Sequence, residues 1–307
     1  MTSSLKRLAA ALAAGADGEV ACDRPLAPFT TYRIGGPTAL WAAPRSEAGV
    51  QRVLQAVHAA GAPLFVLGRG SNLLVSDRGW PGVTLYIGEN LSGVRLAGHE
   101  AEALAGTLLT DLVGATIAHG LGGLELLSGI PGGLGGALRM NAGAFGREIE
   151  SITAEVRGFT ADGSLFTAAR NDLSFGYRRV PELDEVVVTS ARLRFAPDSP
   201  AVLRARSEEI LSMRALKQPL EHPSCGSVFK RPPGYYAGAL IESCGLKGER
   251  VGGAEISCKH AGFILNVGGA SAQDVHRLIR RIERRVHERF GVHLEREVRL
   301  VGDFADA

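Results

Sequence analysis

The fold of this chain is decided by one glycine-rich stretch, Ser128-Gly-Ile-Pro-Gly-Gly-Leu-Gly-Gly-Ala-Leu-Arg-Met-Asn-Ala-Gly-Ala-Phe-Gly146. Seven of its nineteen residues are glycine, against 40 in all 307. Glycine at this density destabilises the interior of a helix or strand. It also lets the backbone turn sharply, point several N–H groups into one hollow and lie against a ligand. Proteins hold a pyrophosphate group in this way, so the stretch predicts a phosphate-binding loop.

A second glycine turn, Gly68-Arg-Gly-Ser-Asn-Leu73, follows the apolar run Leu64-Phe-Val-Leu67. A single glycine-rich loop can be a mere turn, a flexible linker or a tight packing site. The Ser128–Gly146 stretch is apolar, whereas flexible linkers are Ser-rich, and a second such loop also favours ligand binding. Neither loop matches the dinucleotide pattern, and no Walker-type Gly-Lys-Ser/Thr occurs. The two loops indicate a nucleotide held in neither the Rossmann nor the P-loop manner.

Length, charge and cysteine usage limit the class of protein. A chain of 307 residues can bury a substantial core and suggests two or three domains. The net charge of +2, with both signs interspersed, predicts no nucleic-acid interface. The four cysteines form no CxxC pair, which predicts free thiols, no metal site and a reducing compartment.

The N-terminal segment Lys6–Ala16 imitates a short signal peptide. Its alanine-rich composition favours instead an ordinary helix with Ser3 or Ser4 as the N-cap. No apolar run approaches membrane-spanning length. We therefore expect a cytoplasmic protein that binds small molecules, with no membrane contact and no obligate protein partner.

Periodicity and turn signals predict alternating strands and helices. The predicted strands are Thr30–Gly36 (entering a glycine turn), Leu64–Leu67, Ile152–Phe159, Ser164–Thr167, Val186–Phe195 and Val292–Val301. The further predicted helices are Ser46–Gly61, Thr110–His119, Val202–Leu216 and Ser271–Gly291. The last has a carboxylate variant of the capping box, since Asp274 follows Ser271 by three residues. Its basic cluster Arg277–Arg285 is typical of a solvated helix face, because Glu283 and Glu288 share it.

The element order predicts three units. Residues 1–88 form a first α/β unit, residues 89–199 a second that becomes β-rich, and residues 200–307 a third. The best linker candidate is Ala196-Pro-Asp-Ser-Pro200, which has two prolines in five residues. No internal repeat is visible.

Three polar groups of residues lie outside the glycine loops: Phe175-Gly-Tyr-Arg-Arg179, Ser224-Cys-Gly-Ser-Val-Phe-Lys-Arg-Pro232 and Leu294-Glu-Arg-Glu-Val-Arg-Leu300. On a strand, Glu295 and Glu297 would point to the same face. Each group alone is weak evidence for a function. No serine sits in a G-x-S-x-G elbow, so hydrolase chemistry is poorly supported. Composition and spacing therefore indicate an α/β nucleotide-binding enzyme and go no further.

Taken together, these stretches resemble the UDP-N-acetylenolpyruvoylglucosamine reductases, the MurB family of peptidoglycan synthesis. The resemblance runs from about Pro28 to Val301. It rests on nine motifs that stand in the same order: Thr31-Tyr-Arg-Ile-Gly-Gly36, Leu67-Gly-Arg-Gly-Ser-Asn-Leu-Leu74, Ser128-Gly-Ile-Pro-Gly-Gly133, Met140-Asn-Ala-Gly143, Tyr177-Arg178, Arg214-x-x-Lys217, Cys225-Gly-Ser-Val-Phe-Lys230, Lys259-His-Ala-Gly-Phe-Ile-Leu-Asn266 and Leu294-Glu-Arg-Glu-Val-Arg299.

The resemblance implies a non-covalent FAD, NADPH as hydride donor, and roles in cell wall biogenesis, cell shape and cell division. The implied fold is an α+β or α/β two-subdomain FAD-binding fold of the vanillyl-alcohol-oxidase type plus a C-terminal α/β substrate domain. The implied cofactor-binding residues lie in and around both glycine loops: Ile34, Gly35, Leu67, Gly68, Arg69, Gly70, Ser71, Asn72, Leu73, Gly129, Ile130, Pro131, Gly132, Gly135, Gly136, Asn141 and Ala142.

The implied reaction reduces the enolpyruvyl ether of UDP-N-acetylglucosamine to UDP-N-acetylmuramate. Flavin N5 delivers a hydride to the vinyl terminus, and negative charge develops on the adjacent carbon and the carboxylate. Arg178 would stabilise this charge as a forked cation. Ser227 would donate the proton, tuned by Lys230 or by water, and Glu297 would orient the intermediate, with Glu295 as the alternative.

The implied substrate-binding residues are Tyr177, Arg214, Lys217, Lys230, Lys259, His260 and Asn266. Some members of the family carry an extra loop after the Tyr-Arg motif, with a tyrosine that closes over the substrate. The thirty-eight residues between Arg178 and Lys217 contain no tyrosine, so this chain is nearer the shorter variant and its lid is unassigned. Arg231 stands where many members have asparagine. Two rival functions remain at this point: an oxidase of the same fold, and a nucleotide-sugar sensor without turnover.

Overall fold

The computed structural model describes residues 3–15 and 17–304, and the chain divides into two compact units. Unit 1 comprises Met1–Cys22, Ala39–Arg69 and Gly82–Arg214; unit 2 comprises Asp23–Thr38, Gly70–Pro81 and Ala215–Ala307. Each unit buries its own apolar core. The division into three units expected from the sequence stays a prediction.

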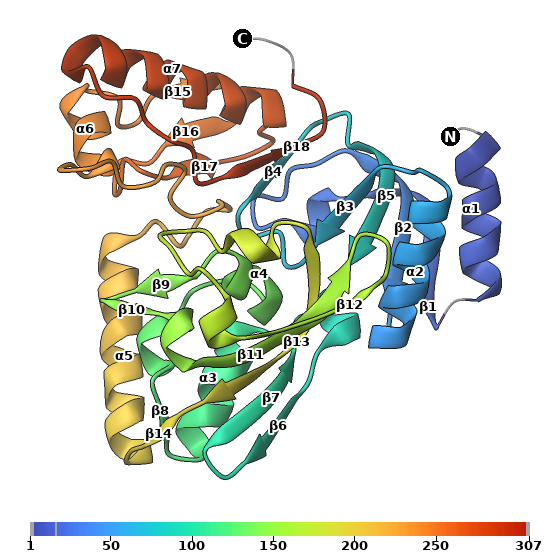
Figure 1. The fold of residues 1–307 in the computed structure, drawn as a ribbon. Helices are drawn as coiled ribbons and strands as arrows, with labels where there is room; N and C mark the ends of the chain where they lie inside the picture. Colours follow the sequence, from blue (N-terminus) through green and yellow to red (C-terminus); the bar gives the residue numbers. More distant parts are fainter. Residues whose placement is uncertain (1–2, 16, 305–307) are drawn as a thin grey trace. The chain divides into compact units, whose positions relative to one another are not determined.

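The first sheet of unit 1 has four strands in the order β1-β2-β5-β3. β3 runs parallel to β5, with Leu64 opposite Val83, and helix α2 connects β2 to β3. Trp41 of β2 stacks on Tyr86 of β5 with their ring centroids 4.8 Å apart. Helix α1 packs on α2 (Figure 1) through three buried leucines. The elements are α1 (Ser3–Ala14), β1 (Gly18–Pro25), β2 (Pro37–Pro44), α2 (Glu47–Ala59), β3 (Leu64–Leu67) and β5 (Trp80–Tyr86).

Helix α2 has the ends that the sequence predicts. The Ser46 hydroxyl accepts a hydrogen bond from Gly49 N at 3.0 Å. At the other end Gly61 adopts φ +58°, and Ala62 N donates to Val57 O at 3.1 Å. This is the Schellman arrangement, in which a left-handed glycine terminates the helix.

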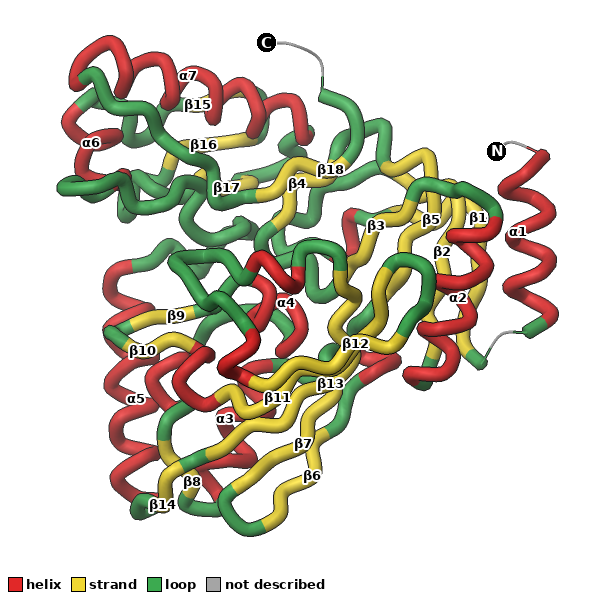
Figure 2. Tube along the Cα trace, in the orientation of Figure 1, coloured by secondary structure: helices red, strands yellow, loops and turns green. Residues whose placement is uncertain are grey.

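The second sheet of unit 1 is antiparallel and has five strands in the order β12-β11-β13-β7-β6, which Figure 2 shows side by side. The predicted strands Ile152–Phe159 and Ser164–Thr167 are confirmed as the antiparallel pair β11 and β12, and the predicted strand that begins at Val186 is confirmed as β13. Short helix α4 packs on β7 and β13. The remaining elements of this unit are β6 (Val94–Ala97), β7 (Glu100–Leu104), α3 (Leu109–Ala118), β8 (Leu121–Gly122), α4 (Leu134–Arg139), β9 (Gly143–Ala144), β10 (Arg147–Glu148), β11 (Thr153–Thr160), β12 (Leu165–Ala169), β13 (Val186–Arg194), β14 (Ala196–Pro197) and α5 (Pro200–Lys217).

Unit 2 contains a three-stranded antiparallel sheet, β15-β16-β17, covered by helix α7. Ser271 and Asp274 form the predicted capping box, and Gly291 ends α7 at φ +67°. Three basic residues of α7, Arg280, Arg281 and Arg284, pair with carboxylates, Arg280 with Glu283 at 2.9 Å, as expected for a solvated face. The elements are β4 (Leu73–Val75), α6 (Ala237–Ser243), β15 (Arg250–Val251), β16 (Ala254–Ile256), β17 (Ile264–Asn266), α7 (Ala272–Phe290) and β18 (Arg299–Val301). β18 pairs parallel with β4.

Two predicted strands are wrong. Thr30–Gly36 is a loop, because Arg33 adopts φ +55° and the Thr30 hydroxyl bonds both the N–H and the carbonyl of Ile34. The predicted strand Val292–Val301 is regular only over β18. Before it, Arg296 forms a single antiparallel bridge with Phe229, in which Lys230 N donates to Glu295 O and Glu297 N donates to Val228 O.

Two further expectations are corrected. Ser3 and Ser4 both lie within α1, so neither is its N-cap. The predicted linker Ala196–Pro200 lies inside unit 1, where β14 pairs with β8 and Asp198 N donates to Gly120 O at 2.9 Å. Among the helices that the structure describes, none has the length and apolarity needed to cross a bilayer.

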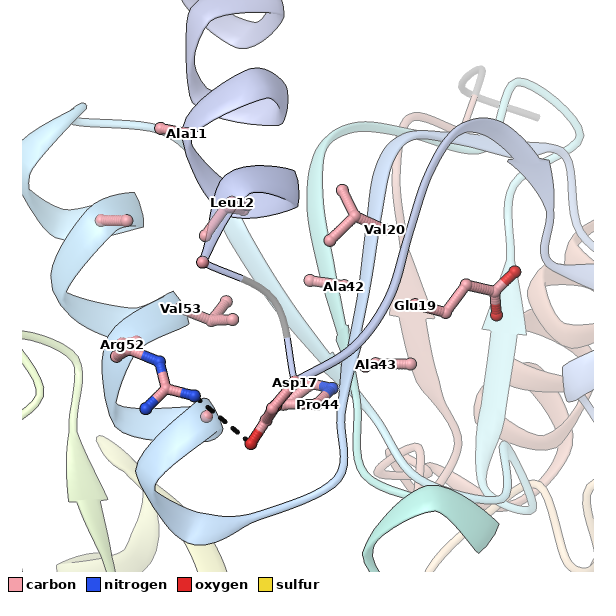
Figure 3. A pocket seen from close by; sticks show the side chains of 14 residues that line it. Ala11, Leu12, Asp17, Glu19, Val20, Ala42, Ala43, Pro44, Arg52 and Val53 are labelled. Carbon is pink, nitrogen blue, oxygen red and sulfur yellow. Dashed lines mark ion pairs between the residues drawn. The ribbon is translucent and has the colours of Figure 1, made fainter.

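A small cavity of about 110 Å³ lies in unit 1 beside α1 and α2 (Figure 3). The Asp17 carboxylate lies beside it and pairs with Arg52 at 3.4 Å. A Cβ at Gly49 would lie 2.1 Å from Asp17 Oδ1, so this glycine admits the carboxylate to the first turn of α2. The cavity therefore lies where Asp17, the residue before β1, contacts helix α2. Its apolar lining includes Ala11, Leu12, Val20, Ala42 and Val53.

Candidate active site

The glycine-rich stretch forms a loop followed by helix α4. Gly129 and Gly132 adopt φ +76° and +132°, which side-chain-bearing residues rarely do. Gly135 donates its N–H to Ala105 O at 2.8 Å, and a Cβ there would lie 2.9 Å from Ala105 Cβ. Gly135 is thus required for packing, and its N–H is already used. Ile130 N likewise donates, to Leu127 O at 3.1 Å.

Gly136 differs from its neighbours. A Cβ at this position would meet no heavy atom of the protein within 4 Å. Glycine within a helix costs about 1 kcal/mol relative to alanine, and neither packing nor a positive φ demands it here. Open space beside a glycine that the fold itself does not need is what a ligand lying against the backbone requires.

Arg178 is held in a strained turn of unit 1. Gly176 N donates to Arg179 O at 2.9 Å, closing the turn, and Arg178 adopts φ +57°. Its guanidinium donates to Gly143 O at 3.1 Å and, more weakly, to Asn141 O at 3.5 Å. Strain at a non-glycine residue persists only where the surroundings enforce it, and it concentrates at functional sites.

Asn141 supplies the support for this turn. It is fully buried and also has a positive φ, +40°. Its side-chain amide donates to Glu148 at 2.7 Å and to Gly176 O at 3.2 Å. Asn141 therefore links the glycine-rich stretch to the Arg178 turn through its side chain as well as through its carbonyl. Ala142, the next residue, is half-buried.

Arg214 also lies at the glycine loop. Its Cδ would be 2.8 Å from a Cβ on Gly129, and its guanidinium lies 5.8 Å from the Phe145 ring centroid. Burial lowers the pKa of this guanidinium. Tyr177 is half-exposed, with the Arg178 guanidinium 5.1 Å from its ring centroid. In unit 1 the structure thus groups Arg178, Arg214 and Tyr177 around the 128–146 stretch.

The upstream turn begins after Leu67, the buried last residue of β3. Arg69 pairs with Glu89, and this hydrogen bond raises the pKa of the guanidinium. Gly70 adopts φ +60°; a Cβ there would lie 2.3 Å from Phe29 O. Its carbonyl accepts from Thr31 N at 3.2 Å. Other expected cofactor contacts lie here. A Cβ on Gly68 would make an ordinary contact of 3.7 Å with Ile87 O, and Ser71, Asn72 and Leu73 are half-buried. In the preceding loop Ile34 is buried and Gly35 adopts φ +147°.

Ser227 and Glu297 lie on neighbouring segments of unit 2. Val228, which follows Ser227, accepts hydrogen bonds on its carbonyl from Glu297 N at 2.8 Å and from Val298 N at 3.2 Å. On the other side, Val228 N donates to Gly262 O at 2.9 Å, and a Cβ on Gly262 would lie 3.8 Å from Ser227 Oγ. Ser227 and Glu297 are 70 positions apart in the sequence, yet Ser227 directly precedes Val228 and Glu297 bonds the Val228 carbonyl.

The two candidate carboxylates have different surroundings. Glu295 is exposed and pairs with Lys230 Nζ at 2.5 Å, and Lys230 N donates to Glu295 O at 2.8 Å. Glu297 is half-buried, and its charge faces the buried Cys225 thiol. Burial, with a contribution from Glu297, raises the pKa of Cys225 to about 12. This thiol is accordingly protonated at neutral pH.

The other expected substrate-binding residues are dispersed in unit 2. Lys259 donates to Ala215 O at 2.6 Å, and Lys217 is exposed. His260 Nδ1 accepts from Gly262 N at 3.1 Å, and burial lowers the pKa of the imidazole. The Asn266 amide donates to Tyr32 O at 3.0 Å and accepts from Ala270 N at 3.1 Å. The structure therefore gives Asn266 a role in holding the first sequence motif.

Comparison with known proteins places these features in a family. Residues 38–169 match the model of an FAD-binding domain, and residues 218–301 match that of the UDP-N-acetylenolpyruvoylglucosamine reductase C-terminal domain. The reductase of Syntrophomonas wolfei is 41% identical over 92% of this chain and 94% of that protein. The Streptococcus thermophilus enzyme is 42% identical over 93% and 94%. The chain belongs to the UDP-N-acetylenolpyruvoylglucosamine reductase family.

A solved structure agrees with this assignment. The crystal structure of the family member from Thermus caldophilus superimposes with a TM-score of 0.79 at 38% identity, covering 92% of this chain and 98% of that one. The chain is therefore an oxidoreductase with an FAD-binding domain, and the predicted fold class is confirmed. The residues present fit the cofactor at Gly136, where the backbone carries no side chain and a Cβ would meet no heavy atom of the protein within 4 Å, so a ligand can approach the backbone there.

Sequence reasoning missed three contributors to the site. Gly143 supplies the carbonyl that accepts from Arg178, and Glu148 accepts from Asn141. Gly143 stands in the Met140-Asn-Ala-Gly143 motif, so a signal existed for it, whereas Glu148 had none. Phe145 is the third, with φ +51° and its ring near Arg214.

Proposed function

We propose that this protein reduces the enolpyruvyl ether of UDP-N-acetylglucosamine to UDP-N-acetylmuramate, with non-covalently bound FAD and with NADPH as the electron donor. The observation that carries the proposal is the placement of Ser227 and Glu297 on segments that share the Val228 carbonyl. FAD, when bound, supplies the chemistry of accepting a hydride from NADPH and transferring one to the vinyl terminus. The rest of the reaction falls to the protein's own groups.

Ser227 donates the proton to the carbon next to the substrate carboxylate. A serine hydroxyl is a weak acid, so it needs a neighbour that favours proton loss. Lys230 is three residues away, but its ammonium is paired with Glu295. Because Lys230 already neutralises the charge of Glu295, this pairing supports Glu297 as the carboxylate that orients the intermediate beside Ser227.

Arg178 stabilises the negative charge that develops on the substrate. A guanidinium stays protonated at any physiological pH and presents a fork of donors that suits a carboxylate. The strained turn and the bond to Gly143 O fix the orientation of the guanidinium before substrate arrives. Donors fixed in advance in this way are worth most in the transition state.

Cations and aromatic groups complete the proposed site. Arg214 and Lys217 anchor the anionic groups of the nucleotide sugar, together with Tyr177, Lys259 and His260. Asn266 contributes by supporting the loop that carries Tyr32. The four cysteines are unpaired, which supports a reducing compartment. We accordingly place the reaction in the cytoplasm, as a step in making the peptidoglycan precursor.

The proposal is tested by an anaerobic spectrum of the purified protein. We expect bound flavin that loses its blue-light absorption when NADPH is added and regains it when the UDP-sugar enol ether follows. Reduced flavin that oxygen reoxidises and the enol ether does not would indicate an oxidase. A protein that cannot be reconstituted with FAD, and binds the nucleotide sugar without turnover, would indicate a sensor.

A further inference from the structure

The glycine turn and the candidate carboxylate are joined by one side chain of unit 2. Asn72 Nδ2 donates to Glu297 O at 3.0 Å, and the Asn72 carbonyl accepts from Arg299 N at 3.0 Å. Asn72 was expected among the cofactor contacts, yet its side-chain amide is directed to a residue 225 positions away. We propose that Asn72 is a positioning residue that fixes the backbone of Glu297 beside Ser227, an inference that rests on the proposed function.

Glu297 needs such support because it lies outside regular structure. The pairing of β4 with β18 begins only at Leu73 and Arg299, two residues beyond Glu297. Glu297 N and Val298 N both donate to Val228 O, at 2.8 and 3.2 Å, so these bonds hold only the N–H side of the two peptide groups and leave the Glu297 carbonyl oxygen to be held by another group. Asn72 supplies that bond, so the peptide groups on both sides of the Glu297 Cα are held by protein groups.

The bond from Asn72 to Glu297 also connects the turn expected to bind the cofactor with the candidate carboxylate, because both lead into the strand pair β4 and β18. Residues 70–72 belong to the turn expected to approach the cofactor and lead directly into β4, and Glu297 leads into β18. A shift of the turn therefore moves Glu297, the carboxylate proposed to orient the intermediate, through Asn72. Displacements of about 1 Å at a catalytic group can cost on the order of 100-fold in rate.

The test is a double-mutant cycle on the two half-reactions of the holoenzyme. We expect Asn72→Ala to slow reoxidation of the reduced flavin by the UDP-sugar enol ether by roughly 10- to 100-fold, and to leave flavin reduction by NADPH unchanged. In a Glu297→Ala background the same substitution should slow reoxidation no further, because Asn72 acts through Glu297. Gln51→Ala is the matched control, since it also removes one amide-to-carbonyl bond, to Gly163 O at 2.9 Å, and should leave reoxidation at the wild-type rate.

Two readouts besides turnover distinguish positioning from loss of cofactor. Apoprotein of the Asn72→Ala variant should bind FAD as tightly as wild type in a flavin fluorescence titration, and its Arg299 amide should exchange hydrogen faster. A weakened FAD affinity that alone accounts for the rate loss would overturn the inference, as would additive rate losses in the double variant. If wild-type protein is not reoxidised by the enol ether, the proposed function fails and the inference with it; failure of the Asn72 variants alone leaves the proposed function standing.

Discussion

Arg178 offers a test that separates catalysis from stability, because its charge and its backbone strain can be removed independently. Arg178→Ala removes the guanidinium and keeps a side chain at φ +57°, whereas Arg178→Gly removes both. Each variant loses the bond to Gly143 O at 3.1 Å. The difference in stability between them therefore reports the backbone strain, less the extra chain entropy that glycine loses on folding.

The left-handed conformation costs a non-glycine residue about 1–2 kcal/mol. We expect the glycine variant to melt roughly 1–3 °C above the alanine variant, as measured by differential scanning calorimetry of holoprotein at one concentration. Glycine also loses more chain entropy on folding, which sets the lower end of this range. The alanine variant should be the less stable of the two.

Activity should respond differently. Removal of one charge-stabilising donor costs about 2.7–4 kcal/mol, or roughly 100- to 1,000-fold in rate. We expect both variants to lose this factor in reoxidation of the reduced flavin by the enol ether, measured by anaerobic stopped flow, with NADPH reduction intact. A glycine variant that keeps wild-type reoxidation would refute the role of the guanidinium, and equal melting temperatures would refute the strain.

Three other predictions follow from the same contacts. Ser227→Ala should leave flavin reduction intact and slow reoxidation by about 100- to 10,000-fold; an equal loss in both half-reactions would count against its role as proton donor. In an alkylation time course followed by mass spectrometry, exposed Cys22 and Cys258 should react first and buried Cys225, whose pKa is raised to about 12, only on unfolding; prompt labelling of Cys225 would contradict its burial. Burial lowers the pKa of His260, so the unfolded chain binds more protons just below its ordinary pKa of 6.5. The free energy of unfolding should therefore fall as pH drops through that value and level off below the pKa of the folded state. Plots of melting temperature against pH for wild type and His260→Gln should diverge in this range, and parallel plots would exclude the effect.

Elements with local signals were predictable from the sequence. Helix α7 shows apolar periodicity, a capping box at Ser271 and a terminal glycine, and all three appear in the structure. Strand β1 gave no such signal: three of its eight residues are charged, none of its residues is a large apolar one other than Val20, and it ends in Pro25. An edge strand needs only one partner and tolerates proline, so burial does not impose an alternating pattern on it.

The site could be predicted by residue type and not by geometry. The motif containing Tyr177-Arg178 drew attention to this turn, but no local pattern signals a positive φ at an arginine; the carbonyls that hold the Arg178 guanidinium belong to Asn141 and Gly143, more than thirty residues earlier. Similarly, the amide of Asn72 bonds a residue 225 positions away. Contacts of such long range are set by tertiary packing, and a single sequence does not contain them.

The central claim is that electrons pass from NADPH to the enolpyruvyl ether on this protein. The most direct measurement is a single turnover in the absence of oxygen, in which NADPH-reduced holoprotein is mixed with one equivalent of the UDP-sugar enol ether and the quenched mixture is analysed by mass spectrometry. We expect stoichiometric flavin reoxidation together with a UDP-sugar heavier by two hydrogens. Flavin that stays reduced, with the enol ether recovered unchanged, would contradict it.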